Sequence, residues 1–157
     1  MTSAMQNPTF TPKNSDFEAR VRASFARQGA MTTMGATMTR VAPGEVEIEL
    51  PWAPGLTQQH GFLHGGVVAS VLDSACGFAG FSLMPADCAV LTVEFKINFV
   101  APAKGQRFRM HGVVIKPGRT ITLVEGRAWS LDHGRDQLIA TMSCTLMALA
   151  GRENIQD

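Results

Sequence analysis

The chain has 157 residues, a length that fits one domain with a single hydrophobic core. Hydrophobic residues make up 45% of it and charged residues 17%, which is the composition of a folded protein and not of a disordered one. The formal net charge of +1 excludes a strong overall field that would attract nucleic acid or an anionic membrane. We therefore expect neither as a partner.

The cysteines and the ends of the chain indicate the compartment. Cys76, Cys88 and Cys144 are odd in number and have no CxxC spacing, so we interpret them as reduced core thiols of a cytoplasmic protein. No set of Cys and His has the spacing of a zinc site, and we expect no metal. No apolar run reaches membrane-spanning length, and the first residues lack the features of a signal peptide.

The first half of the chain is predicted to contain a short helix and two strands. The helix starts near Ser15 and is expected to end at Gly29. One strand is expected over about residues 31–41. A second covers residues 45–50, where apolar residues alternate with glutamates.

A long helix and four further strands are predicted for the rest. From Gly65 to about Met84 the residues are small and apolar on nearly every side, which is typical of a helix buried in a core. The four strands follow at residues 91–99, 107–116, 120–131 and 137–149. Short turns between them indicate an antiparallel meander. In the first of these strands, apolar residues at odd positions alternate with polar residues at even positions, including Thr92.

These elements define an α+β fold in which an antiparallel sheet wraps around one long central helix. They leave a single domain at residues 15–150, with a flexible tail at residues 1–14 and a second tail at residues 151–157. A sheet of this size has edges and an outer face that invite pairing with another copy, so we expect a homo-oligomer.

The stretch from Gln58 to Asp73, QQHGFLHGGVVASVLD, carries the chemical information. Gly65 and Gly66 stand where a loop becomes the long helix, and the first N–H groups of a helix have no partner inside it. Because glycine lacks the Cβ that keeps a ligand away, this helix start is suited to an anion or a developing oxyanion. Asp73 follows among apolar residues, where a carboxylate needs a partner or a purpose.

The spacing of these two features constrains how they cooperate. Asp73 lies seven residues after Gly66, so the two are roughly 10 Å apart along the helix. One carbonyl carbon cannot touch both groups of the same helix. If both serve one reaction, the helix start of one chain faces Asp73 of a second chain, and a two-fold dimer contains two equivalent sites.

The HGG motif at residues 64–66, followed by the Leu-Asp pair at residues 72–73, resembles the hotdog-fold thioesterases. The resemblance is to the phenylacetic-acid-pathway type and the Arthrobacter-type 4-hydroxybenzoyl-CoA thioesterase, and it covers about residues 35–149. It implies a hotdog fold and hydrolysis of acyl-CoA to a carboxylate and coenzyme A, without metal or cofactor. It also implies an obligatory dimer and an expected tetramer of paired dimers.

The resemblance further implies catalytic roles for five residues. Gly65 would donate its backbone N–H to the thioester carbonyl, and Asp73 from the partner chain would attack that carbonyl or activate water. Gln58 matches an Asn or Gln that orients the thioester or water, and His64 would support the loop and the site. Thr92 falls where some relatives place a hydroxyl residue near the carboxylate. His64 is also suited to simple capping of the helix.

The predicted substrate-binding residues are Gly66, Lys116 and Arg119. The two cations flank a Pro-Gly turn and would meet the phosphates of coenzyme A, although a solvated hairpin turn explains them equally well. Some relatives carry Thr where this chain has Gly77, so the resemblance does not define the substrate in detail. Aryl, arylacetyl and medium-chain acyl groups all stay open.

Three other functions are compatible with the same fold. A non-catalytic acyl-CoA-binding protein would release no thiol from acyl-CoA. A dehydratase or hydratase would need an Asp–His pair, and no His follows Asp73 within the helix. A purely structural subunit leaves the buried carboxylate without an explanation.

Overall fold

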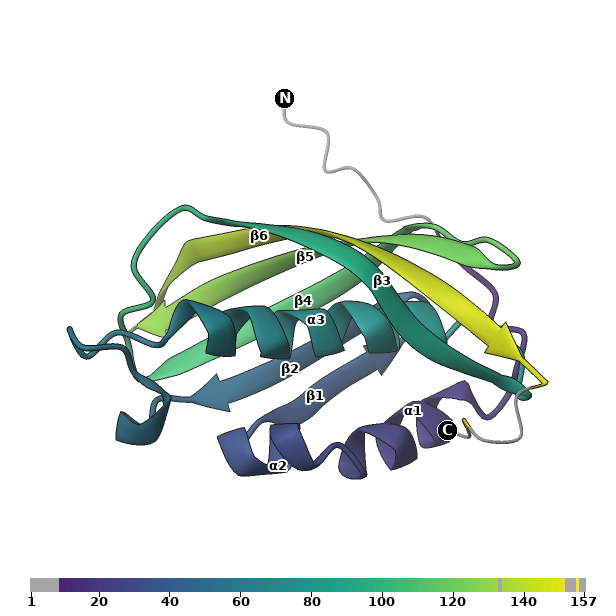
Figure 1. The fold of residues 1–157 in the computed structure, drawn as a ribbon, viewed down its shortest axis with the longest axis horizontal. Coiled ribbons are helices and arrows are strands. Elements are labelled where there is room, and N and C mark those ends of the chain that lie inside the picture. The colour runs from purple at the N-terminus through teal and green to yellow at the C-terminus, as the bar shows by residue number, and fades with distance from the viewer. Residues whose placement is uncertain (1–8, 133, 152–154, 156–157) are drawn as a thin grey trace.

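The structure is a computed structural model that describes residues 9–132, 134–151 and 155. The elements in chain order are α1 (Phe17–Ala26), α2 (Gly29–Met34), β1 (Thr37–Ala42), β2 (Glu45–Pro51), the 3-10 turn η1 (Pro54–Leu56), α3 (Gly65–Phe81), β3 (Cys88–Phe99), β4 (Arg107–Lys116), β5 (Ile121–Asp132) and β6 (Arg135–Ala150). Six strands curve around α3, and α1 and α2 lie beside β1 (Figure 1). The predicted hotdog fold, an antiparallel sheet around one central helix, is confirmed.

The predicted tails are only partly described. Residues 1–8 of the first tail lie outside the described residues, and Phe10 packs against the hydrophobic core. Of the second tail, residues 151 and 155 are described. Among the described residues, every helix is too short or too polar to cross a membrane.

The strand order is β1-β2-β4-β5-β6-β3, and all neighbouring strands are antiparallel. The predicted meander of the last four strands is therefore correct only for β4, β5 and β6. β3 pairs with β6 at the far edge and not with β4. The connection at residues 100–106 must span three inter-strand spacings, about 14 Å, which seven residues cover easily.

The strand expected from residue 31 is wrong at its start, because Gly29–Met34 forms the helix α2. Gly35 ends this helix in the left-handed conformation, with φ of 75°, and β1 begins at Thr37. The threonines of this segment favour strands locally. The helical turn prevails because it places Met31 in the core, with 3% of its surface exposed. The first helix also ends before Gly29.

Two glycines in the sheet allow α3 to lie close against it. Gly112 on β4 and Gly126 on β5 are directly opposite each other. A Cβ on Gly112 would lie 2.5 Å from the carbonyl oxygen of Ala75, and one on Gly126 would lie 2.7 Å from Sγ of Cys76. Since Ala75 and Cys76 immediately follow Asp73 and Ser74 on the helix, this glycine pair sets the depth of the helix near the carboxylate.

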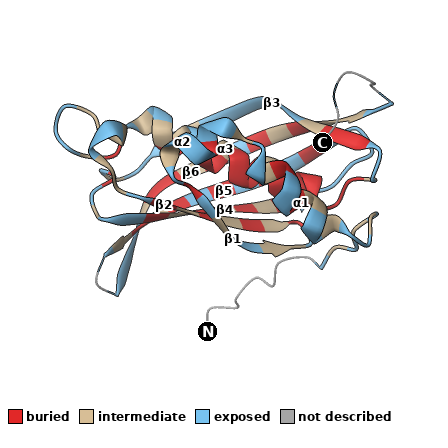
Figure 2. Cartoon of the chain, turned by 90° about the horizontal axis from the view of Figure 1, so that it is seen from below, coloured by how far each residue is buried: buried red, intermediate tan, exposed pale blue. Residues whose placement is uncertain are grey.

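Burial differs sharply between α3 and β3. Most of α3 is buried together with the inner faces of β2, β4 and β5, as predicted for the central helix (Figure 2). The edge strand β3 instead has apolar side chains at the surface: Leu91, Val93, Phe95 and Phe99 are 48%, 55%, 43% and 53% exposed. An unpaired strand edge with exposed apolar side chains is a surface suited to another chain.

Candidate active site

The start of α3 presents one free backbone donor. His64 is the N-cap residue, and its Nδ1 accepts a hydrogen bond of 2.9 Å from the N–H of Gly66. The N–H of Gly65 has no hydrogen-bond partner among the described residues. Gly65 is therefore placed as a potential oxyanion donor at the positive end of the helix, whereas the N–H of Gly66 is occupied. The geometry of His64 agrees with capping.

The loop before α3 is folded back on itself. Thr57 and Leu63 form an isolated antiparallel bridge, and the N–H of Leu63 donates to the carbonyl of Ala103 at 3.0 Å. Gln58 lies inside this narrow loop, partly buried, and its side-chain oxygen accepts a hydrogen bond from the N–H of His60. Its amide nitrogen has no partner among the described residues, which leaves a donor near the helix start.

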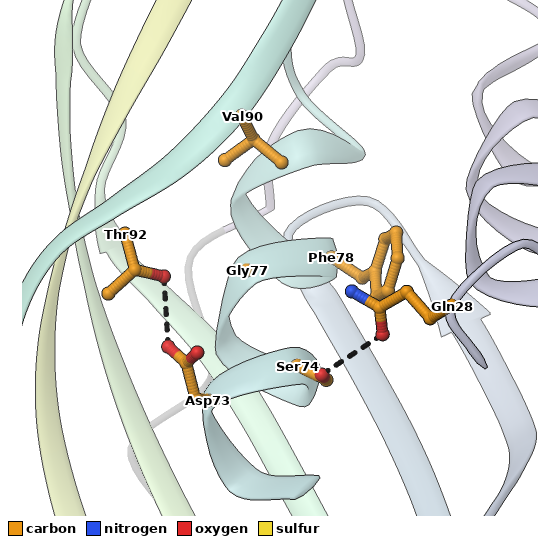
Figure 3. A pocket seen from close by; sticks show the side chains of 7 residues that line it. All are labelled: Gln28, Asp73, Ser74, Gly77, Phe78, Val90 and Thr92. Atoms are coloured by element: carbon orange, nitrogen blue, oxygen red, sulfur yellow. Dashed lines mark hydrogen bonds between the residues drawn. The ribbon is translucent and has the colours of Figure 1, made fainter. Parts of the chain in front are cut away.

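Asp73 lies in the middle of α3 and is partly buried. Its Oδ1 accepts a hydrogen bond of 2.9 Å from Oγ1 of Thr92 (Figure 3). Sγ of Cys144 lies 4.0 Å from the same oxygen. Burial raises the pKa of the Asp73 carboxyl above its ordinary value, and the Thr92 hydrogen bond opposes this rise. A raised pKa makes the ionised carboxylate a stronger base.

A β-bulge brings Thr92 to the carboxylate. The register of β3 against β6 shifts between Thr92 and Glu94. Thr92 is paired with Leu146, and Phe95 with Cys144, and both of these β6 residues are buried in the core. Thr92 and Phe95 therefore share the inner face, although strict alternation would put them on opposite faces. Because the bulge inserts one residue, it redirects the Thr92 hydroxyl toward α3.

A pocket of about 80 Å³ opens beside the carboxylate (Figure 3). Its lining residues are Gln28, Asp73, Ser74, Gly77, Phe78, Val90 and Thr92. Four of them come from α3, two from β3, and one from the junction of α1 and α2. Neither Gln28 nor Ser74 is predictable from the sequence as a pocket residue, since no local signal connects a residue before α2 with the central helix.

The other predicted site residues do not meet at this pocket. Gly65 and Asp73 are eight residues apart on α3, about 12 Å, so within one chain they stay separate. Gln58 and His64 belong to the helix start. Lys116 and Arg119 are exposed on the β4–β5 hairpin, and neither has a hydrogen-bond or ion-pair partner among the described residues.

One group of possible metal ligands occurs in the described part of the chain, on β2 and β4. The ligand atoms of Glu45, Glu47 and His111 lie within 4.8 Å of one another. Two of its members have partners within the chain, because Glu45 contacts both Arg40 and, at 2.8 Å, Nε2 of His111. None of its members lines the pocket at Asp73.

A curved antiparallel sheet around one central helix is the architecture of the hotdog class. The sequence model of the thioesterase superfamily matches residues 60–136. A crystal structure of a thioesterase family protein from Silicibacter pomeroyi is 54% identical, with a TM-score of 0.85; the alignment covers 86% of this chain and 99% of that one. The chain belongs to the thioesterase superfamily, and the predicted family is confirmed.

More distant similarities agree with this membership. The E. coli PaaI protein from the phenylacetic acid degradation operon shares the fold, with a TM-score of 0.78 and 14% identity over 88% of this chain and 97% of that one. A Saccharolobus solfataricus protein assigned as an esterase is 35% identical over 82 residues, 52% of this chain. That match spans 58% of the Saccharolobus protein. Family membership implies thioester hydrolysis in general and an oligomeric assembly.

Proposed function

We propose that the chain hydrolyses acyl-CoA thioesters to a carboxylate and coenzyme A, at a site formed between two copies. Asp73 of one chain acts as nucleophile or general base, and the N–H of Gly65 in the other chain stabilises the oxyanion. The observation that carries this proposal is the Asp73 carboxyl itself. It is partly buried, its pKa is raised by burial, and it opens onto a pocket in a thioesterase fold.

The need for two chains follows from the positions of the two groups. Gly65 and Asp73 are about 12 Å apart on one helix, and a thioester carbonyl must reach both. The β3 edge offers a surface for a two-fold partner, because it is unpaired and carries exposed apolar side chains. Pairing of β3 with its symmetry copy would extend the sheet and set the two α3 helices side by side, antiparallel.

A second contact would join two dimers into a tetramer. The outer face of the sheet has exposed apolar side chains near one end of β4 and β5: Ile115, Ile121 and Leu123 are 48%, 42% and 44% exposed. We expect light scattering of the purified protein to report four chains. Substitution of Leu123 by Glu on this face would then reduce the assembly to dimers that keep their thioesterase activity.

Two chemical routes are compatible with the position of Asp73. As a general base, Asp73 removes a proton from water, whose oxygen attacks the carbonyl carbon; the C–S bond then breaks and the thiolate takes up the proton. As a nucleophile, the carboxylate attacks the carbonyl carbon and the C–S bond breaks, which gives a mixed anhydride and the coenzyme A thiolate; water then hydrolyses the anhydride to two carboxylates, and the thiolate takes up one of the released protons. Single-turnover hydrolysis in ¹⁸O water separates the routes, since label enters the Asp73 carboxyl only on the nucleophilic route.

The proposal also covers the residues that bind coenzyme A and the cellular location of the protein. Lys116 and Arg119 are unpaired cations within the described chain, and we assign them to the phosphates of coenzyme A. Cys76, Cys88 and Cys144 are free and buried. Free thiols are normal in the reducing cytoplasm, which is the location that we propose.

The decisive test is release of free thiol from a panel of acyl-CoA esters. We expect the wild-type chain to release thiol and Asp73→Asn to lose most of this activity. Asp16→Asn is the matched control, because Asp16 is exposed and makes no side-chain capping bond. Binding of acyl-CoA without thiol release would overturn hydrolysis and identify a non-catalytic acyl-CoA-binding protein.

A further inference from the structure

The pocket beside Asp73 has a polar wall made by Gln28 and Ser74. The Ser74 hydroxyl donates to Oε1 of Gln28 at 3.1 Å. The side-chain oxygen of Gln28 is thus occupied by Ser74. The side-chain nitrogen has no hydrogen-bond partner among the described residues and is available to a ligand. Figure 3 shows the nitrogen directed toward Gly77 across the pocket. The pocket therefore contains an uncharged donor opposite the carboxylate.

The backbone holds Gln28 in a fixed position between two helices. Its N–H donates to the carbonyl of Phe25 at 3.0 Å, and its carbonyl accepts from the N–H of Thr32 at 3.2 Å. The ring of Phe25 in turn packs edge-on against Phe78, another lining residue, with ring centroids 5.9 Å apart. A side chain anchored in this way has little freedom to lose on binding, which makes it a selective contact.

Gly77 supplies the space in this pocket. It lies in the interior of α3, where glycine is less stable than alanine. A Cβ built on Gly77 meets nothing within 4 Å, whereas one on Gly80 would lie 2.3 Å from Leu146. Packing therefore does not require glycine at position 77. The missing side chain instead leaves room on the helix face one turn beyond Asp73.

We propose that this pocket binds the acyl group and that Gln28 is a specificity-determining residue, selecting short acyl groups that carry an uncharged hydrogen-bond acceptor. The inference rests on the proposed function, since it assigns the acyl part of that same site. An acyl chain whose carbonyl lies at Asp73 runs past Gly77 and meets the amide nitrogen of Gln28. Hydroxyacyl and ketoacyl groups supply the oxygen that this donor needs.

Size and charge narrow the substrate class. The pocket volume of about 80 Å³ is well below the roughly 150 Å³ of an engineered cavity that holds benzene, so only a short part of an acyl group lies inside it. Phe78 and Val90 offer apolar walls for the carbon atoms. A carboxylate at the end of the acyl group is disfavoured, because the lining includes the Asp73 carboxyl and no cation.

The test compares matched thioesters that differ only by one oxygen. We expect wild-type kcat/KM to be about tenfold higher for 3-hydroxybutyryl-CoA and acetoacetyl-CoA than for butyryl-CoA. Gln28→Leu should reduce this ratio to about one, because the donor is gone. Gln137→Leu makes the same chemical change at an exposed position on β6 and should keep the wild-type ratio. Ser74→Ala is a second test of the same contact. It removes the hydrogen bond that orients the Gln28 amide, so the kcat/KM ratio between the oxygen-bearing thioesters and butyryl-CoA should fall.

Gly77→Ala separates pocket space from folding. The substitution adds a methyl group to the pocket and favours the helix, so we expect an unchanged or higher Tm. It should also lower kcat/KM for butyryl-CoA relative to acetyl-CoA, which needs less room. Two results would overturn the inference and leave the proposed hydrolysis intact. One is equal kcat/KM of the wild-type enzyme for the matched thioesters, and the other is an unchanged kcat/KM ratio in Gln28→Leu. A whole panel without thiol release would overturn both.

Discussion

Two variants that are each inactive should restore activity to one another when their chains are mixed. Asp73→Asn removes the carboxylate, and Gly65→Pro removes the backbone donor at the helix start. Because these groups are about 12 Å apart on α3, a site that uses both takes them from different chains. A mixed dimer then contains one site with both groups intact and one site with neither.

The expected losses in the separate variants are large. Removal of a general base costs about 10²–10⁴ in kcat, and removal of one oxyanion donor costs about 10²–10³. Proline is compatible with position 65, because Gly65 is the first residue of α3 and its N–H is unpaired within the described chain. His64, with φ of −63° and ψ of 137°, already has the extended conformation that precedes proline.

A matched control isolates the missing N–H. Gly65→Ala adds a Cβ that meets the ring of Phe99 at 3.2 Å, as proline does, but it keeps the donor. Its kcat should therefore exceed that of Gly65→Pro by about 10²-fold. Similar losses in the alanine and proline variants would attribute the defect to the ring contact and contradict the role of the N–H.

A site shared between two chains predicts the fraction of wild-type activity that the mixed variants recover. Equal amounts of the two variants, refolded together, give about half mixed dimers, and each mixed dimer has one working site of two. The thiol-release rate should therefore reach about one quarter of the wild-type rate, which is well above that of either variant alone. Different affinity tags on the two chains verify that mixed dimers form. Mixed dimers with only the residual rate of the parents would refute the shared site.

The Asp73→Asn variant should stay folded, and its stability should respond to pH in a defined direction. Since burial raises the pKa of the Asp73 carboxyl, the folded chain disfavours its charged form. The contribution of Asp73 to stability is thus largest below its unfolded pKa and decreases as pH rises through the folded pKa. We expect Asp73→Asn to have an equal or higher Tm at neutral pH, with a gap that shrinks in acid. A lower Tm at neutral pH would contradict this reasoning.

Three further variants test the surroundings of the site. Thr92→Val removes the hydrogen bond that lowers the pKa of Asp73, so the acidic limb of the kcat/KM profile should move to higher pH; an unmoved limb would exclude this coupling. His64→Ala should cost about 1 kcal/mol in urea unfolding, while His64→Asn should restore the cap and most of that stability; equal losses in the two variants would contradict the capping role. Gly112→Ala should destabilise the fold by roughly 1–3 kcal/mol in the same assay, because its Cβ meets the backbone of Ala75; unchanged stability would show that the helix shifts freely.

The sequence by itself determined the central helix, the approximate extent of most strands and the most informative motif. The helix start at Gly65 was readable because a loop with glycines precedes a run of small apolar residues. Asp73 was recognisable because a carboxylate among such residues is unusual. Both signals are local, so they can be recognised in the sequence without knowledge of the neighbouring strands.

The tertiary structure alone decided which groups surround Asp73. Alternation in β3 reports a period of two, but it does not report a bulge, so the inward direction of Thr92 was invisible in the sequence. Gln28 reaches the pocket from 45 residues away along the chain, through a junction of two helices where the sequence predicted the end of a single helix and then a strand from about residue 31. The position of β3 next to β6 also depends on long-range pairing. Contacts between distant segments depend on the register and packing of the whole sheet, which short sequence patterns do not encode.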